Sequence, residues 1–214
     1  MNRNLTLFLL LGGVGTGWGS TQVLGKWATS TGYQPFGLIF WQFVIATLVL
    51  GGVAVARGRS FQITRPAIRF AVVIAIIGTI IPNFTFYWAI TRLPAGIMSI
   101  IIAAVPMMAF PIALLIGMDR FSYARLAGLC AGLLGVALIA LPEASLPSAA
   151  MAVALPVALL GPLFYAFESN FVAWHGSAGL GAIQAMALSS AFGVVLTLPL
   201  TLGMGQWINP FVSF

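Results

Sequence analysis

Residues 86–141 read FYWAITRLPAGIMSIIIAAVPMMAFPIALLIGMDRFSYARLAGLCAGLLGVALIAL, and this stretch decides the fold class. It predicts the end of one apolar helix, a turn at Arg92 and Pro94, and a second apolar helix that contains Pro106 and Pro111. A short charged turn and a third, glycine-rich helix follow. Because lipid offers no partner to unpaired backbone groups, such long apolar stretches are predicted to cross a bilayer as helices.

The composition of the whole chain agrees with this reading. Charged residues make up 6% of the 214 residues and hydrophobic residues 61%, and the mean hydropathy is +1.08. A soluble domain carries about a quarter charged residues, so this chain lacks the polar surface that water requires. Period-two alternation is absent, which argues against a membrane β-barrel. We therefore predict an all-α polytopic membrane protein.

Seven membrane-spanning helices are predicted from the hydropathy pattern. They cover residues 5–27, 36–56, 67–90, 95–118, 126–141, 150–173 and 181–202.

The basic residues predict how these helices are oriented. One end of the bundle would carry Arg3, Arg57, Arg59, Arg65, Arg69, Arg120 and Arg125, and the other end Lys26 and Arg92. The end richer in basic residues faces the cytoplasm in membrane proteins, so we expect a multi-pass protein of the inner or plasma membrane with a cytoplasmic N-terminus. The basic residues lie in separate short turns rather than in one patch, so no nucleic-acid partner is predicted.

Two parts of the sequence repeat the same order of features. Residues 18–27 (WGSTQVLGKW) precede a helix with Gln42, and residues 165–174 (YAFESNFVAW) precede a helix with Gln184. The repeating unit would contain five helices, and because five is odd the second copy would be inverted in the membrane.

This repeat divides the chain into two predicted domains. Residues 1–142 would form the first five-helix repeat, and residues 150–214 an incomplete second repeat of two helices. A complete second copy needs three further helices, so we expect about seven of ten helices, in a truncated chain or a fragment.

The stretch that opens this section, together with residues 18–27, resembles the first repeat of the EamA family in the drug/metabolite transporter superfamily. Pro106 matches the proline of the family's fourth helix, and residues 126–141 match its glycine-rich fifth helix. Two positions depart from the family pattern: Asp119 stands where the turn usually has Glu, and Gln42 where many members have Arg. The resemblance implies a transporter of small organic metabolites or drugs, built from two inverted five-helix halves.

Polar and aromatic residues occur at a similar depth in several predicted spans. Together they would line a central cavity that binds a small amphipathic organic solute through aromatic faces and a few hydrogen bonds. The candidate substrate-binding residues are Trp18, Ser20, Thr21, Gln22, Gln42, Asn83, Tyr87, Tyr165, Glu168 and Asn170. The alternative for any one of them is a hydrogen bond that packs one helix against another.

Glu168 is the strongest single candidate for a functional residue within a membrane span. A charged side chain at the bilayer centre costs roughly 2.5 kcal/mol or more, and such residues often mark proton or substrate sites. Glu168 would lie only a turn or two from the cytoplasmic end of its helix, so pairing with an Arg or reaching the interface is the alternative. A functional Glu168 would exchange a proton during transport.

Other features leave alternatives open. Lys26 would either pair with a substrate carboxylate or extend to the outer interface. Pro82, Pro106 and Pro111 each remove a backbone hydrogen bond, so their helices are expected to kink or open there. The close glycines are Gly128, Gly132 and Gly135, and they would permit close approach within the repeat or between the protomers of a homodimer.

The predicted function is secondary active transport of small organic metabolites or drugs by alternating access, with proton coupling as an added hypothesis that depends on Glu168. The sequence contains no P-loop, so no nucleotide cofactor is predicted. Its few acids, with His175 and Cys130, are scattered, so neither a metal site nor an enzyme is predicted. A membrane-embedded enzyme, a structural or channel module, and a non-functional truncated fragment remain the alternatives.

Overall fold

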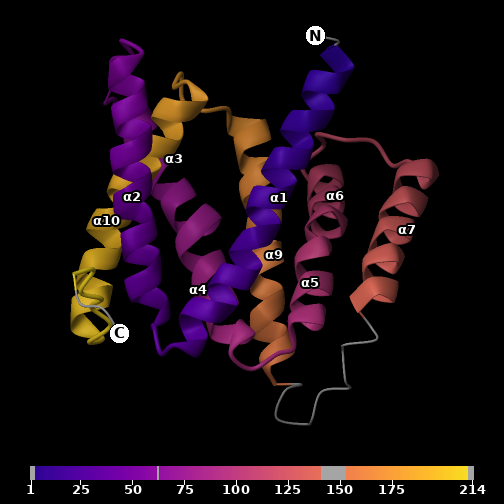
Figure 1. Cartoon of the computed structure of the whole chain (residues 1–214). Helices are drawn as coiled ribbons and strands as arrows, with labels where there is room; N and C mark the ends of the chain where they lie inside the picture. The colour runs from indigo at the N-terminus through magenta and orange to yellow at the C-terminus, as the bar shows by residue number, and fades with distance from the viewer. Residues whose placement is uncertain (1–2, 62, 141–152, 212–214) are drawn as a thin grey trace.

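The computed structural model describes residues 3–61, 63–140 and 153–211, and these residues form a bundle of helices without a strand (Figure 1). Its elements are α1 (Arg3–Ser30), α2 (Pro35–Ala56), α3 (Arg65–Ile74), η1 (Ala75–Ile80), α4 (Ile81–Ile90), α5 (Ala95–Ala103), α6 (Val105–Leu115), α7 (Tyr123–Ala140), α9 (Ala154–His175) and α10 (Ala182–Gly203). In the described residues, 6 helical stretches are long and apolar enough to cross a membrane, and α7 adds a shorter apolar helix. The predicted all-α polytopic class is confirmed. The first residues of the predicted span 150–173 lie outside the described residues.

The prolines of the third and fourth spans have different local effects. The π-helical segment η1 leads directly into α4, whose second residue is Pro82. Proline has no N–H to donate to the carbonyl four residues earlier, and its ring clashes with that carbonyl, which accounts for the widened turn. The fourth span is broken at Ala104, just before Pro106. By contrast α6 continues through Pro111, so the opening expected at that residue is absent.

The turns of the bundle separate into two ends. The start of α1, the α2–α3 turn and the α6–α7 turn lie at one end, and the α1–α2 and α4–α5 turns at the other (Figure 1). The turns that carry most of the basic residues therefore lie together. α1 and α9 run in opposite directions, as do α2 and α10. Any bundle whose consecutive helices alternate in direction would show these orientations. The inverted repeat and the two domains therefore stay predictions.

Buried residues form separate clusters between the helices, one beside α9 and another beside α10, whereas α1 contributes little to them. Ala154 and Ala158 of α9 pack against a cluster on α4 and α5 that includes Ala89 and Ile101. Small side chains allow helices to approach closely in a membrane, where dispersion contacts and hydrogen bonds take the place of the hydrophobic effect. α1 lies across this layer, and its most apolar window has 0% of its residues buried, against 22% for α9. The wall formed by α9 is thus packed, whereas α1 covers it loosely.

One glycine sets the distance between α9 and α4. A Cβ added at Gly161 of α9 would lie 3.2 Å from Thr85 Oγ1 and 3.6 Å from the Pro82 carbonyl oxygen. Thr85 Oγ1 donates within its own helix, to carbonyl oxygens of Ile81 and Pro82. The Pro82 region of α4 therefore packs directly on the backbone of α9.

Candidate functional site

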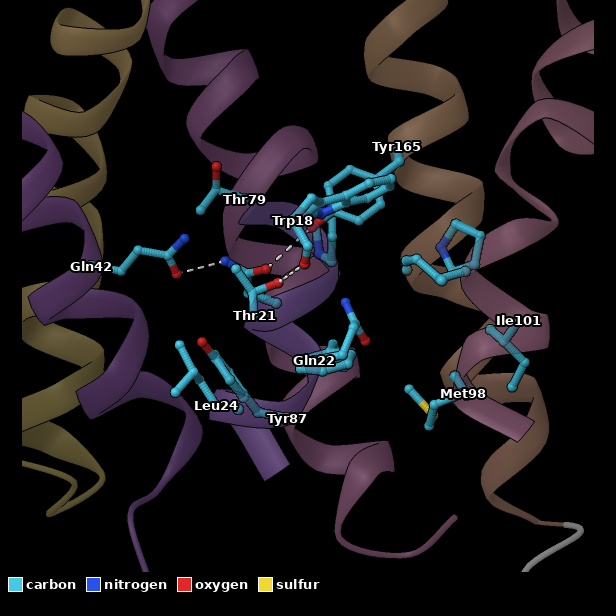
Figure 2. Close-up of a pocket in the computed structure, with 18 of the residues that line it drawn as sticks. Trp18, Thr21, Gln22, Leu24, Gln42, Thr79, Tyr87, Met98, Ile101 and Tyr165 are labelled. Carbon is cyan, nitrogen blue, oxygen red and sulfur yellow. Dashed lines mark hydrogen bonds between the residues drawn. The ribbon is translucent and has the colours of Figure 1, made fainter. Parts of the chain in front are cut away.

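A cavity of about 420 Å³ lies between α1, α2, η1, α4, α5 and α9 (Figure 2). Its walls combine aromatic rings, amides, hydroxyls and aliphatic side chains. The lining residues are Trp18, Thr21, Gln22, Leu24, Gly25, Ala28, Gln42, Gly78, Thr79, Pro82, Asn83, Phe86, Tyr87, Met98, Ile101, Ile102, Ala158, Gly161, Pro162 and Tyr165. None of these side chains carries a formal charge at neutral pH. The size and chemistry fit a small organic molecule held by rings and a few hydrogen bonds.

Three side chains from three helices form a hydrogen-bonded chain across one wall. Asn83 Nδ2 donates to Gln42 Oε1 over 2.9 Å, and Tyr165 Oη donates to Asn83 Oδ1 over 3.2 Å. The first of these bonds is visible in Figure 2, where Gln42 reaches toward the centre of the site. Asn83 directly follows Pro82, so the widened turn places it between α2 and α9. The chain joins α2, α4 and α9 through neutral groups.

Aromatic rings form another part of the wall, which meets the hydrogen-bonded chain at Tyr165. Trp18 of α1 meets Tyr165 edge to face, with ring centroids 6.3 Å apart and planes inclined by 84°. Phe86 and Tyr87 meet at 5.4 Å and 63° on α4. A Cβ added at Gly25 would lie 2.9 Å from the Phe86 ring, so this glycine lets α1 approach α4. The rings offer both faces and edges to a ligand.

Gln22 stands where the cavity meets a second, more apolar groove. The groove holds about 710 Å³ between α1 and α5, and Gln22, Met98 and Ile102 line both spaces. Gln22 Oε1 is buried and has no hydrogen-bond partner within the described part of the chain. A buried acceptor without a partner is costly and therefore available to a donor on a ligand.

Lys26 lines this groove. Its Nζ donates to the carbonyl oxygen of Ile90 over 2.5 Å, at the C-terminal end of α4. A cation at that end of a helix is favourable because unpaired carbonyls concentrate negative charge there. This contact ties α1 to α4, an arrangement that neither sequence-based alternative for Lys26 anticipated.

The predicted site residues divide into two groups. Those that line the cavity are Trp18, Thr21, Gln22, Gln42, Asn83, Tyr87 and Tyr165. The other three lie elsewhere. The Ser20 hydroxyl is exposed and donates to the Gly17 carbonyl of its own helix over 2.7 Å. Asn170 Nδ2 donates to Ala109 O of α6 and to Ala166 O, which is the packing role weighed as its alternative.

Glu168, the third of these, does not line the cavity. Its carboxyl group lies against Gly78 of η1, in the position that a side chain at Gly78 would occupy. Neither an Arg nor any other hydrogen-bond partner of Glu168 is found among the described residues. Pairing with a nearby Arg, one of the alternatives for this residue, is thus absent from the described structure.

Several residues that shape the site were not singled out in the sequence. Thr79 lines the cavity, and Gly25, Gly78 and Gly161 each allow a close contact between helices. The position of Gly78 four residues before Pro82 was a usable signal, because a helical proline clashes with that carbonyl. The other two glycines carry no local signal, since their role depends on the helix opposite.

The described residues contain no group of three or more His, Cys, Asp or Glu side chains able to hold a metal ion. His175 stacks on Phe171 at 5.1 Å and on Phe70 at 6.5 Å. Asp119 pairs with Arg125 in the α6–α7 turn. These polar groups lie outside the cavity and stabilise turns and helix ends.

A profile of the EamA-like transporter family matches residues 5–141. The match includes α1 through α7 and every cavity helix except α9. No curated protein matches the chain, and no solved structure matches it.

Proposed function

Because the chain belongs to the EamA-like transporter family, we propose that it is a secondary active transporter that moves small organic solutes across a membrane by alternating access. The observation that carries this proposal is the 420 Å³ cavity with its neutral, partly aromatic lining. A solute would stack against Trp18 and Tyr165 and exchange hydrogen bonds with Asn83 and Gln22.

The lining also indicates the class of solute. A buried ionic group needs an opposite charge or many hydrogen bonds, and the cavity lining supplies no formal charge. The preferred solutes would therefore be small, amphipathic and without net charge. Metabolites and drugs of this kind are both compatible with the cavity.

Two breaks in the helices support a change of shape during transport. The η1–α4 junction contributes Gly78, Thr79 and Pro82 to the cavity wall. The α5–α6 break at Ala104 follows directly on the wall residues Ile101 and Ile102. Widened turns and breaks bend more easily than continuous helices, so these two places would act as hinges.

The orientation follows from the basic turns. The α2–α3 and α6–α7 turns lie at the same end as the start of α1, which supports a cytoplasmic N-terminus in an inner or plasma membrane. Proton coupling is part of the proposal, since Glu168 is the acid within a membrane-spanning helix of the described structure.

Reconstitution tests this proposal. The purified chain in phosphatidylethanolamine–phosphatidylglycerol liposomes should take up at least one solute from a panel of tritiated neutral, cationic and anionic compounds, with saturation and a preference for neutral members. Asn83→Ala removes both bonds of the hydrogen-bonded chain and should raise KM about tenfold. Ser20→Ala, outside the cavity, should leave KM unchanged. Uptake no greater than in protein-free liposomes for the whole panel would refute the proposal.

A membrane-embedded enzyme or a channel is the competing function. An enzyme would convert a solute of the panel rather than accumulate it, and a channel would not saturate. Product analysis and the concentration dependence of uptake separate both from a transporter.

A further inference from the structure

Glu168 lies in a notch over Gly78, a residue that also lines the solute cavity, although Glu168 itself does not line it. A Cβ added at Gly78 would lie 2.5 Å from Glu168 Oε1, 2.6 Å from its Cδ and 3.0 Å from its Oε2. These distances are too short for real atoms, so the carboxyl group occupies the space that only a glycine leaves free. The notch is formed by the backbone of η1, and Glu168 enters it from α9.

The notch lies on the widened turn of the third span. η1 is π-helical, with the Ile81 N–H bonded to the Ile76 carbonyl five residues earlier. Pro82 cannot donate to the Gly78 carbonyl as the fourth residue of an ordinary helix would. Single π-helical turns inside helices are frequent at functional sites. A carboxyl group thus meets the least regular backbone of this span.

Among the residues that the structure describes, none forms an ion pair with Glu168. The elements packed on α9 include η1, α5 and α6, and their sequences contain no titratable side chain. α4 contributes Tyr87, and α9 itself Tyr165 and the terminal His175. α3 meets α9 through the contact of Phe70 with Phe171. Its basic residues are Arg65 and Arg69, two turns or more before Gly78, and neither forms an ion pair with Glu168.

A lone carboxylate in such a place has one simple way to lose its charge, which is to bind a proton. A metal cation would require several oxygen ligands, and the described residues supply a single carboxyl group at this place. Resting on the proposed function, we propose that Glu168 in the notch over Gly78 is a proton site beside the solute cavity, with Gly78 as its positioning residue. The carboxylate takes a proton from water on one side of the membrane and releases it to water on the other.

Tyr165 links this proton site to the cavity. It precedes Glu168 by three residues, so the two side chains project from the same face of α9 on successive turns. The Tyr165 hydroxyl donates to Asn83, and its ring meets Trp18. A change of charge at Glu168 therefore acts on a side chain that a solute would touch. Figure 2 shows Tyr165 and Thr79, the neighbour of Gly78, at the edge of the cavity.

The first test measures protonation without any solute. Dicyclohexylcarbodiimide reacts with protonated carboxyl groups in membranes, and mass spectrometry locates the adduct. Labelling of Glu168 in the reconstituted chain should fall as the pH rises from about 5 to about 9. Gly78→Ala puts a methyl group into the notch and should change the labelling at a fixed pH by about threefold or more. Gly52→Ala, with nothing within 4 Å of its new Cβ, is the matched control and should label as the unmodified chain does.

Either of two labelling results would overturn the proton site. One is labelling of Glu168 that is absent or constant over the whole pH range. The other is a Gly78→Ala chain that labels as the Gly52→Ala control does.

The second test separates proton coupling from transport itself. With a solute identified in the panel, uptake should rise on imposing a pH gradient. Glu168→Gln, which resembles the neutral carboxyl group, should retain solute exchange without a gradient and lose this rise. A variant that still responds to the gradient contradicts coupling at Glu168. Failure of the unmodified chain to transport any solute would instead refute the proposed function, and the labelling result would still decide whether the proton site exists.

Discussion

α1 and α9 carry the same order of aromatic, small and polar residues, but the structure uses the two helices differently. In α9 the polar side chains bind other helices, as Tyr165 does with Asn83 and Asn170 with Ala109 O. In α1 the hydroxyls of Ser20 and Thr21 bind their own backbone, and Lys26 near its end bonds across to α4. Buried contacts follow the same division, with 0% of the best window buried in α1 and 22% in α9.

This difference indicates a fixed wall and an adjustable wall around one cavity. Side chains that bond across helices hold α9 in one register against α4 and α6. Side chains that bond within α1 leave the whole helix free to shift without breaking those bonds. Trp18 and Gln22 of α1 face the cavity, so a shift of α1 would reshape the cavity from one side. Two pairs of variants, Gly161→Leu with Gly17→Leu and Tyr165→Phe with Thr21→Val, each compare a substitution in α9 with one in α1.

The largest effect is expected at Gly161. Gly161→Leu would drive a side chain into Thr85 and the Pro82 carbonyl, and overpacking of this kind destabilises by about 1–3 kcal/mol or more. At Gly17 on α1 an added Cβ would meet nothing within 4 Å, and Gly17→Leu replaces a poor helix former with a good one. The unfolding temperature in detergent micelles should therefore fall for Gly161→Leu and stay the same or rise for Gly17→Leu.

A similar loss in both Gly→Leu variants would remove the distinction between a packed and a loose wall. If neither variant lowered the unfolding temperature, the close contact of α9 with α4 at Gly161 would not restrict the size of the side chain there.

Tyr165→Phe is expected to have an intermediate effect. It keeps the ring against Trp18 and removes the hydroxyl donor to Asn83, at a cost of about 1 kcal/mol. Thr21→Val removes a hydroxyl that only bonds its own helix, and should cost less than about 0.5 kcal/mol. Unfolding free energies measured in the same micelles check the difference. Equal losses would mean that the hydrogen-bonded chain does not stabilise the fixed wall.

Much of the fold was predictable because helices that cross a bilayer can be recognised in a sequence by their length and hydropathy. The spans at residues 36–56 and 67–90 differ from the observed helices only near their ends. Most of the proposed site residues also line the cavity, since polar residues within spans rarely face lipid. What the sequence did not reveal is which side of α1 faces inward, so Ser20 and Thr21 were not distinguished.

The notch over Gly78 shows the other limit of sequence reasoning. Glu168 stood out as an acid within a span, but its partner is a glycine, whose role is to leave space. Pro82, four residues later, marks the backbone at Gly78 as irregular, but which side chain enters the space depends on the opposite helix. Prolines have the same dependence on context, because α6 accommodates Pro111 whereas the helix before Pro82 widens.

The smallest effect is expected at Lys26, which joins α1 to the C-terminal end of α4. Lys26→Met removes the bond from Nζ to the Ile90 carbonyl, a contact of a cation with a helix C-terminus worth about 0.3–1 kcal/mol. If α1 is the adjustable wall, amide hydrogen exchange in α1 should rise about two- to fivefold while exchange in α9 stays unchanged. Lys26→Arg keeps the charge and the donors and should behave as the unmodified chain does. An equal rise in α9 would mean that both helices move as one body. Gln22, whose Oε1 is buried without a described partner, would then be held in place by the packing of the whole bundle rather than by the position of α1.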